Sequence, residues 1–114
     1  MQLFVFDYHG TLTTVDPLPF LTALRRKHPG ACVVVMTGSH PSEIKAQHPG
    51  LERVLDAIWS KSDSFSQRLG EGSFHEITFV DDDPDFREIM GVRLRKHPFS
   101  VRILDESGLL GLLR

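Results

Sequence analysis

The fold of this chain is decided by residues 3–12, which read LFVFDYHGTL. Four consecutive apolar residues, from Leu3 to Phe6, are typical of a strand that is buried on both faces of a parallel sheet. The strand ends at the carboxylate of Asp7, and Gly10 follows where the chain has to turn sharply. This stretch therefore predicts a buried strand that delivers an acidic side chain to one edge of a sheet.

Short apolar runs and amphipathic stretches alternate along the rest of the chain. We expect strands over 31–36 and 77–80, and helices over 17–27, 42–47, 64–69 and 84–90, the last of them stopped by Gly91. Residues 51–59 fit either a helix or a short buried strand, residues 92–95 alternate as an edge strand does, and the segment after Phe99 is left unplaced. Alternating strands and helices predict a three-layer α/β fold with a Rossmann-like parallel sheet, and 114 residues predict a single domain over 1–114.

Composition excludes several classes of protein. The 13 basic and 15 acidic residues give a formal charge of -2, which argues against a nucleic-acid-binding surface. The single cysteine, Cys32, excludes an intramolecular disulfide framework and a zinc site built from several cysteines. Because the sequence has no run of about 20 apolar residues and does not begin like a signal peptide, we expect a cytoplasmic protein without a membrane partner.

Reactive side chains follow the predicted strands. In open parallel sheets the ligand site lies at the carboxyl ends of the strands, where we expect Asp7, the pair Thr37 and Gly38, Lys61, and the pair Asp81 and Asp82. Carboxylates from two strand ends suit Mg²⁺. A lysine and a turn with free backbone N–H groups suit a tetrahedral anion, and a carboxylate can attack a magnesium-bound phosphoryl group.

These motifs together resemble those of the haloacid dehalogenase (HAD) superfamily. Residues 4–12 resemble its first motif, in which Asp-x-Asp-Gly-Thr follows an apolar strand, and residues 33–38 resemble its second. Lys61 stands where the third motif has its lysine, and residues 79–82 resemble the fourth motif, an apolar strand that ends in paired acids. The four motifs occur in the order of the family, so the resemblance implies a HAD core.

The resemblance also implies roles for individual residues. Asp7 matches the nucleophile that forms an aspartyl-phosphate, and Lys61 matches the cation that orients nucleophile and phosphate. Thr37, with Gly38 beside it, matches the part of the site that binds the phosphoryl oxygens. The implied Mg²⁺ ligands are Asp7, Asp82, Asp81 as a ligand or in the surrounding shell, and His9 through its backbone carbonyl.

The chain departs from the family pattern at two positions and in length. The phosphatases of the family have a second Asp at the position of His9, as general acid and then base; histidine can also transfer protons near neutral pH. Phe86 stands where the fourth motif has a further acid. The short connections leave no room for a cap domain, so an open crevice and a large phosphorylated substrate are expected.

The function expected from this resemblance is that of a capless Mg²⁺-dependent phosphatase, with alternatives that stay open. Because His9 replaces the second Asp of the family's phosphatases, a weakly active or non-catalytic phosphate- or protein-binding module remains one alternative. The other is a metal-independent hydrolase of the dehalogenase type, since family members that act on carbon–halogen bonds also lack this acid. Residue by residue, Asp7 can also simply cap a turn, and Lys61 can be an ordinary surface lysine.

Two surface features have simple structural interpretations. We interpret the basic cluster at residues 93–97 as the charge that protects an exposed edge strand. The leucines of residues 109–113 are expected to pack on the sheet, with dimerisation as the alternative, so the chain is expected to be a monomer or a homodimer.

Overall fold

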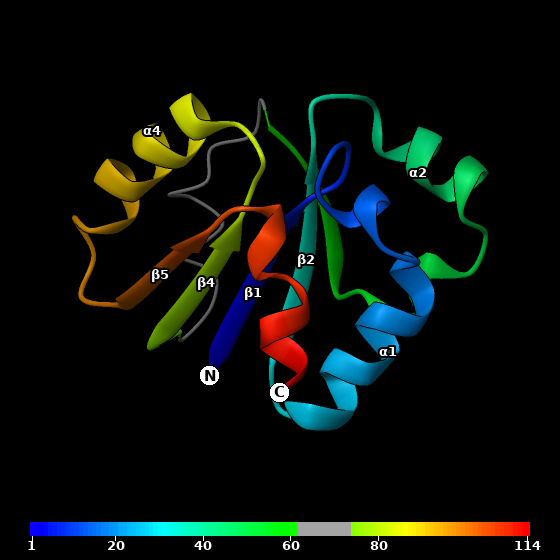
Figure 1. Ribbon diagram of the computed structural model, residues 1–114, viewed down its shortest axis with the longest axis horizontal. Helices are drawn as coiled ribbons and strands as arrows, with labels where there is room; N and C mark the ends of the chain where they lie inside the picture. Colours follow the sequence, from blue (N-terminus) through cyan, green and yellow to red (C-terminus); the bar gives the residue numbers. More distant parts are fainter. Residues whose placement is uncertain (62–73) are drawn as a thin grey trace.

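The computed structural model describes residues 1–61 and 74–114, and within them the chain forms one five-stranded parallel sheet (Figure 1). The strands lie in the order β3-β2-β1-β4-β5, with every neighbouring pair parallel. Their bounds are Gln2–Asp7 for β1, Cys32–Thr37 for β2, Ala57–Ser60 for β3, Glu76–Val80 for β4 and Ser100–Leu104 for β5. The predicted α/β fold with a parallel sheet flanked by helices is confirmed.

The α-helices of the described residues are α1 (Pro17–Lys27), α2 (Pro41–Gln47) and α4 (Pro84–Leu94), and each begins at a proline. Proline suits this position because its fixed φ matches the helix and its missing N–H has no partner there. Short 3-10 helices cover Leu12–Thr14 (η1), Leu51–Val54 (η2), Glu106–Gly108 (η3) and Leu110–Leu113 (η4). No helix in residues 1–61 and 74–114 is both long and apolar enough to cross a membrane. The helix predicted over 64–69 lies outside the described residues.

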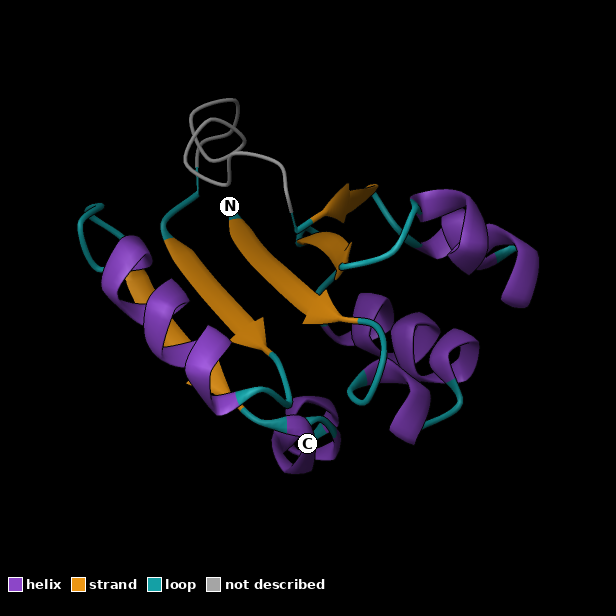
Figure 2. Ribbon diagram, turned by 90° about the horizontal axis from the view of Figure 1, so that it is seen from above, coloured by secondary structure: helices purple, strands orange, loops and turns teal. Residues whose placement is uncertain are grey.

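Both faces of the sheet are buried, which explains the continuous apolar run of β1. Alternate side chains of a strand point to opposite faces. Accordingly, Phe4 and Phe6 pack in one cluster with helix α1, where the ring of Phe6 meets Phe20 edge to face. Leu3 and Val5 belong to a second cluster, which includes residues of α4. Figure 2 shows the helices around the strands. β1 is therefore buried in the centre of the sheet, with its carboxyl end at the middle of one edge.

The expected edge strand over 92–95 is wrong, because α4 continues to Leu94. Gly91 does not stop the helix. It lies against β5, where an added Cβ would come within 3.0 Å of Cδ1 of Ile103, so the glycine permits close packing of the helix on the strand. Met90 and Leu94, four residues apart on one helical face, are buried under α4. Arg93 and Arg95 thus lie at the end of a helix, Lys96 and His97 lie in the turn after it, and the strand at this edge is Ser100–Leu104.

The C-terminal segment packs on the face of the sheet that α1 covers. After β5 the chain forms η3 and η4, and Leu109 and Leu112 are buried in the same cluster as Phe20 and Leu24 of α1. The expectation that the leucines pack on the sheet is confirmed for these two, while Leu110 is exposed. In the ambiguous stretch 51–59, η2 is followed by strand β3.

Arg25 joins α1 to two neighbouring segments. Its Nε donates a hydrogen bond of 2.8 Å to the carbonyl of Val54, and its Nη1 donates one of 3.3 Å to the carbonyl of Ala31. Its Nη2 lies 2.8 Å from Asp56, whose carboxylate also accepts the N–H of Val33 at 2.7 Å. One guanidinium therefore connects the end of α1, the start of β2 and the turn before β3.

Replacing Arg25 by methionine should lower the free energy of unfolding by about 1–3 kcal/mol, because it removes the donor of two backbone carbonyls and the ion pair with Asp56. Urea denaturation, monitored by circular dichroism, measures this effect. The control is Arg26→Met, since Arg26 is exposed on the same helix turn. Equal midpoints for the two variants would show that the Arg25 bonds contribute nothing measurable.

Candidate active site

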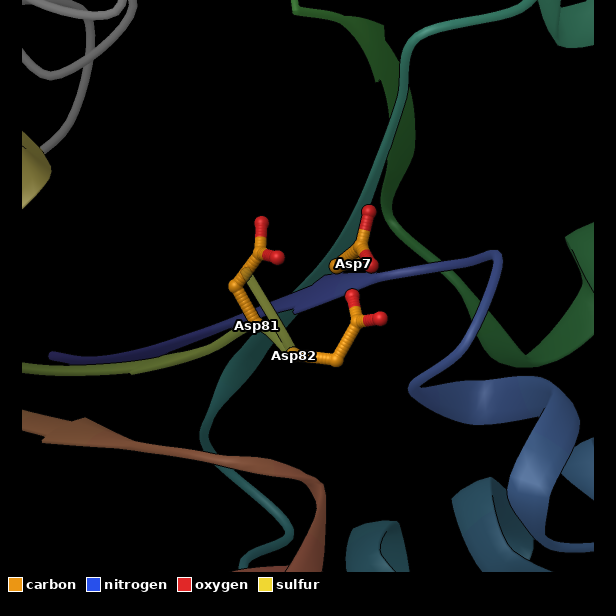
Figure 3. Close-up of side chains that lie close together, drawn as sticks. All are labelled: Asp7, Asp81 and Asp82. Atoms are coloured by element: carbon orange, nitrogen blue, oxygen red, sulfur yellow. The ribbon is translucent and has the colours of Figure 1, made fainter. Parts of the chain in front are cut away.

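The side chains of Asp7, Asp81 and Asp82 lie close together at the carboxyl edge of the sheet (Figure 3), and Lys61 forms ion pairs with two of them. Asp7 is the last residue of β1, Asp81 and Asp82 directly follow β4, and Lys61 directly follows β3. The backbone N–H of Lys61 donates to the carbonyl of Thr37 at 2.9 Å, which extends the pairing of β3 with β2 by one step. Parallel register thus brings together side chains that lie up to 75 residues apart in sequence.

Lys61 forms ion pairs with two of the carboxylates. Its Nζ lies 2.9 Å from Oδ1 of Asp7 and 3.1 Å from Oδ2 of Asp81. The pKa of Lys61 is raised: burial acts to lower it, and the two carboxylates more than offset that effect. Lys61 is therefore a charged ammonium that bridges the ends of β1 and β4.

The carboxyl group of Asp7 is buried and has an unusual pKa. Burial, which disfavours the charged form, is the main reason that the pKa of Asp7 rises from 3.8 to about 6. The ammonium of Lys61 opposes this rise, and the charge of Asp81 and a hydrogen bond with Asp82 add to it. The ionisation of Asp7 thus depends on its burial and on the charges beside it, and pKa values perturbed in this way are common at functional sites.

The two acids after β4 differ in their surroundings. Asp81 has no exposed surface, and burial raises its pKa although the N–H of Asp83 and Lys61 act against the rise. Asp82 is exposed, and its pKa is lowered chiefly by the hydrogen bond with Asp7. Asp82 is therefore the acid of the pair that readily stays ionised at neutral pH.

Further hydrogen bonds hold the carboxyl groups in place. Thr11 Oγ1 donates to Oδ2 of Asp7 at 3.1 Å, and the N–H of Asp83 donates to Oδ1 of Asp81 at 2.9 Å. Nη1 of Arg87 donates to the backbone carbonyl of Asp81 at 2.8 Å. Each buried oxygen of the site thus has a donor, which fixes the rotamers of Asp7 and Asp81.

Gly10 allows the loop after β1 to pass against Asp82. Its φ of +78° lies in the left-handed region, and an added Cβ would lie 2.9 Å from Cγ of Asp82. The glycine predicted to allow a sharp turn therefore also meets a steric requirement, because it lies next to an acidic side chain. The backbone N–H of Gly10 donates to Thr13 Oγ1 at 2.9 Å, which closes the turn.

Thr37 and Gly38 lie at the end of β2, where the strand prediction placed them. Thr37 is fully buried, and its hydroxyl oxygen accepts the N–H of Ser39 at 3.0 Å, so it shapes the turn that follows β2. A hydroxyl that accepts one hydrogen bond can still donate its own hydrogen. Gly38 is exposed, with open space around its Cα.

His9 is exposed, and its ring meets that of Tyr8 edge to face at 4.9 Å. Tyr8 is fully buried and donates a hydrogen bond of 3.0 Å from its hydroxyl to Oε1 of Gln47, at the end of α2. The loop that carries His9 is therefore tied to α2 through the preceding tyrosine, and the imidazole packs on Tyr8.

The set of oxygen ligands fits a hard divalent cation. Asp7, Asp81 and Asp82 each offer a carboxylate oxygen, and these atoms lie within 4.8 Å of one another. When all three acids are ionised, Lys61 leaves this group with two uncompensated negative charges, which a divalent cation would neutralise. Carboxylate oxygens are the ligands that Mg²⁺ prefers.

Three residues outside the predicted set of site residues also contact the site: Thr11, Arg87 and Phe86. The hydroxyl of Thr11, which lies in the stretch that resembles the first motif, donates to Asp7. The contact of Arg87 with the site could be predicted only from the helix start at Pro84. Because α4 begins there, its first turn brings the side chain of Arg87 back to the backbone carbonyl of Asp81. Phe86 lies under Lys61, with the ring centroid 4.5 Å from Nζ.

Neither a protein-family model nor a curated protein sequence matches this chain.

Proposed function

We propose that this chain is a capless hydrolase of the HAD type that cleaves phosphate monoesters with Mg²⁺ and forms an aspartyl-phosphate on Asp7. One observation carries the proposal: Asp7, Asp81 and Lys61 come from three strand ends and meet within hydrogen-bonding distance at one edge of a parallel sheet. A half-buried lysine that bridges two buried acids is costly to maintain, and such groups gather at functional sites.

Each residue has a chemical task in this proposal. An oxygen of Asp7 attacks phosphorus, the P–O bond to the ester oxygen breaks, and the leaving oxygen takes up a proton. Water then attacks the phosphorus of the aspartyl-phosphate, releasing inorganic phosphate and the carboxylate of Asp7. In this scheme His9, which is exposed and follows β1 two residues after Asp7, donates the first proton and accepts one from the water.

Thr37, the N–H groups around Gly38, and Lys61 bind the phosphoryl oxygens in this scheme. Asp7, Asp81, Asp82 and the backbone carbonyl of His9 would hold Mg²⁺. When bound, the cation offsets the negative charge of the phosphoryl group and allows Asp7 to stay ionised. An uncapped site fits a large phosphorylated substrate better than a small one that must be enclosed.

The test is hydrolysis of p-nitrophenyl phosphate by the purified chain with Mg²⁺ and with EDTA, beside the Asp7→Asn variant. Turnover that needs Mg²⁺ and disappears in the variant supports the proposal. Activity on a haloacid that survives EDTA would instead favour displacement at carbon. A folded protein without turnover, whose melting temperature rises with Mg²⁺ and phosphate, would favour a binding module.

The binding module is the second candidate, and the position of His9 favours it. The imidazole is exposed and packs on Tyr8, and proton transfer to a leaving group depends on that side chain alone in our scheme. If this is the weak point of the site, the site would bind a phosphorylated ligand well and turn it over slowly.

Replacing His9 by aspartate should raise the rate of p-nitrophenyl phosphate hydrolysis by roughly tenfold or more, since a well-placed general acid is worth about 10²–10⁴. Steady-state kinetics of His9→Asp and of the control His9→Asn measure this effect. If both variants are as slow as the wild type, proton transfer at position 9 does not limit the reaction.

A further inference from the structure

Phe86 occupies an unusual place beside the charged groups of the site. It lies in the first turn of α4, where its N–H is one of two that the carboxylate of the helix cap, Asp83, accepts. Its ring packs on Phe79 of β4, with centroids 5.8 Å apart, and Phe79 is fully buried. The orientation of Phe86 is therefore set from two sides, by the helix start and by the core.

The ring of Phe86 faces the ammonium of Lys61 at 4.5 Å from its centroid. This distance is within the range of cation–π attraction, which orients a cation over an aromatic face. The same ammonium lies 2.9 Å from Asp7 and 3.1 Å from Asp81. Lys61 has a long, flexible side chain, and its contacts come from the ends of β1 and β4 and from α4.

We infer that Phe86 is a positioning residue, which holds the ammonium of Lys61 between Asp7 and Asp81 by offering it an aromatic face. An aromatic ring attracts the cation without carrying a charge, so it does not draw Lys61 away from the two acids. A carboxylate at this position would compete with Asp7 and Asp81 for the same ammonium, and an aliphatic side chain would leave that side of it without an attractive partner. The contact itself is independent of the proposed function, while its effect on catalysis rests on that function.

The side chain of Lys61 can be observed directly by NMR, because the chain has only four lysines: Lys27, Lys45, Lys61 and Lys96. The variant Lys61→Arg assigns the Lys61 signals by their loss. In the wild type, the Cε protons of Lys61 should resonate upfield of those of the other lysines and be inequivalent, since they lie near an aromatic ring and are held in one orientation. In Phe86→Leu both features should disappear, and in Phe86→Tyr they should return.

Phe99→Leu is the matched control, because Phe99 is also a half-buried aromatic residue at the edge of the same apolar cluster, where it packs on His97. This variant should leave the Lys61 signals in place. Inequivalent Cε protons that persist in folded Phe86→Leu would show that the two acids hold Lys61 without the ring, and would overturn the inference.

Kinetics test the consequence for catalysis separately. Phe86→Leu should lower kcat for p-nitrophenyl phosphate by about 3- to 10-fold, and Phe86→Tyr should restore it. If Phe86→Leu kept full activity although the Cε signals of Lys61 had changed, the role of Phe86 in catalysis would be overturned. A wild type that shows the NMR signature but no turnover would contradict the proposed phosphatase and leave the positioning of Lys61 by Phe86 supported.

Discussion

Asp7→Asn is expected to lower Mg²⁺-dependent phosphatase turnover by on the order of 10³-fold or more, and at the same time to stabilise the metal-free protein above pH 6. Turnover falls because an amide cannot attack phosphorus as a carboxylate does. Stability rises because the site disfavours the charge of Asp7, whose pKa is raised to about 6. Steady-state kinetics and thermal melting in EDTA, at pH 4, 5 and 8, measure the two effects.

The sign of the stability effect follows from proton linkage. Between about pH 4 and pH 6 the folded protein binds a proton at Asp7 that the unfolded chain has already released, so wild-type stability decreases as the pH rises through this range. A pKa displaced from 3.8 to about 6 corresponds to roughly 3 kcal/mol once the group is ionised in both states. The variant carries no charge at position 7, so its advantage should be small at pH 4 and reach its full size above pH 6.

Asp82→Asn provides the control of opposite sign. The pKa of Asp82 is lowered by its hydrogen bond with Asp7, so its charge is favoured in the folded protein. This variant should therefore lose stability at pH 5, where Asp7 still carries the proton that it donates to Asp82. Two results for Asp7→Asn would contradict the prediction. Equal stabilisation at pH 4 and pH 8 would show that the buried charge does not cause the gain in stability. Retained turnover would exclude Asp7 as the nucleophile.

Gly10→Ala is expected to weaken Mg²⁺ binding by about tenfold or more and to destabilise the protein by about 1–2 kcal/mol. The backbone cost comes from the φ of +78°, which is unfavourable for a residue with a Cβ. The loss of metal affinity comes from the Cβ itself, which would overlap the carboxyl group of Asp82 and push it from its position. Isothermal titration calorimetry with MgCl₂ and urea denaturation measure these effects.

Gly50→Ala separates the two causes. Gly50 also has a left-handed φ, of +91°, but an added Cβ there would meet open space. This variant should lose stability by a similar amount and leave the affinity for Mg²⁺ unchanged. Equal affinities in the two variants would mean that Asp82 does not hold the cation, or that it moves without consequence.

Local sequence patterns were sufficient for most of the elements. The apolar run before Asp7 is a central strand, and the helix predicted over 17–27 has those bounds, because proline and the residues 28–30 mark its ends unambiguously. The predicted end of the last helix at Gly91 was wrong. Glycine often ends a helix, but here it lies inside α4, where the close approach of the helix to Ile103 favours a residue without a Cβ. That contact lies between segments that are separate in sequence, so no local pattern could predict it.

For the candidate site too, some features follow from the local sequence and others from the tertiary structure. By itself, the sequence determined which side chains stand at the ends of the parallel strands, because a buried apolar run can end only where polar residues begin. Only the tertiary structure decided their neighbours: the ammonium of Lys61 between Asp7 and Asp81, the ring of Phe86 beneath it, and the hydroxyl of Thr11 on Asp7. These contacts depend on the order and register of the strands and on the rotation of α4, which arise from the packing of the whole sheet.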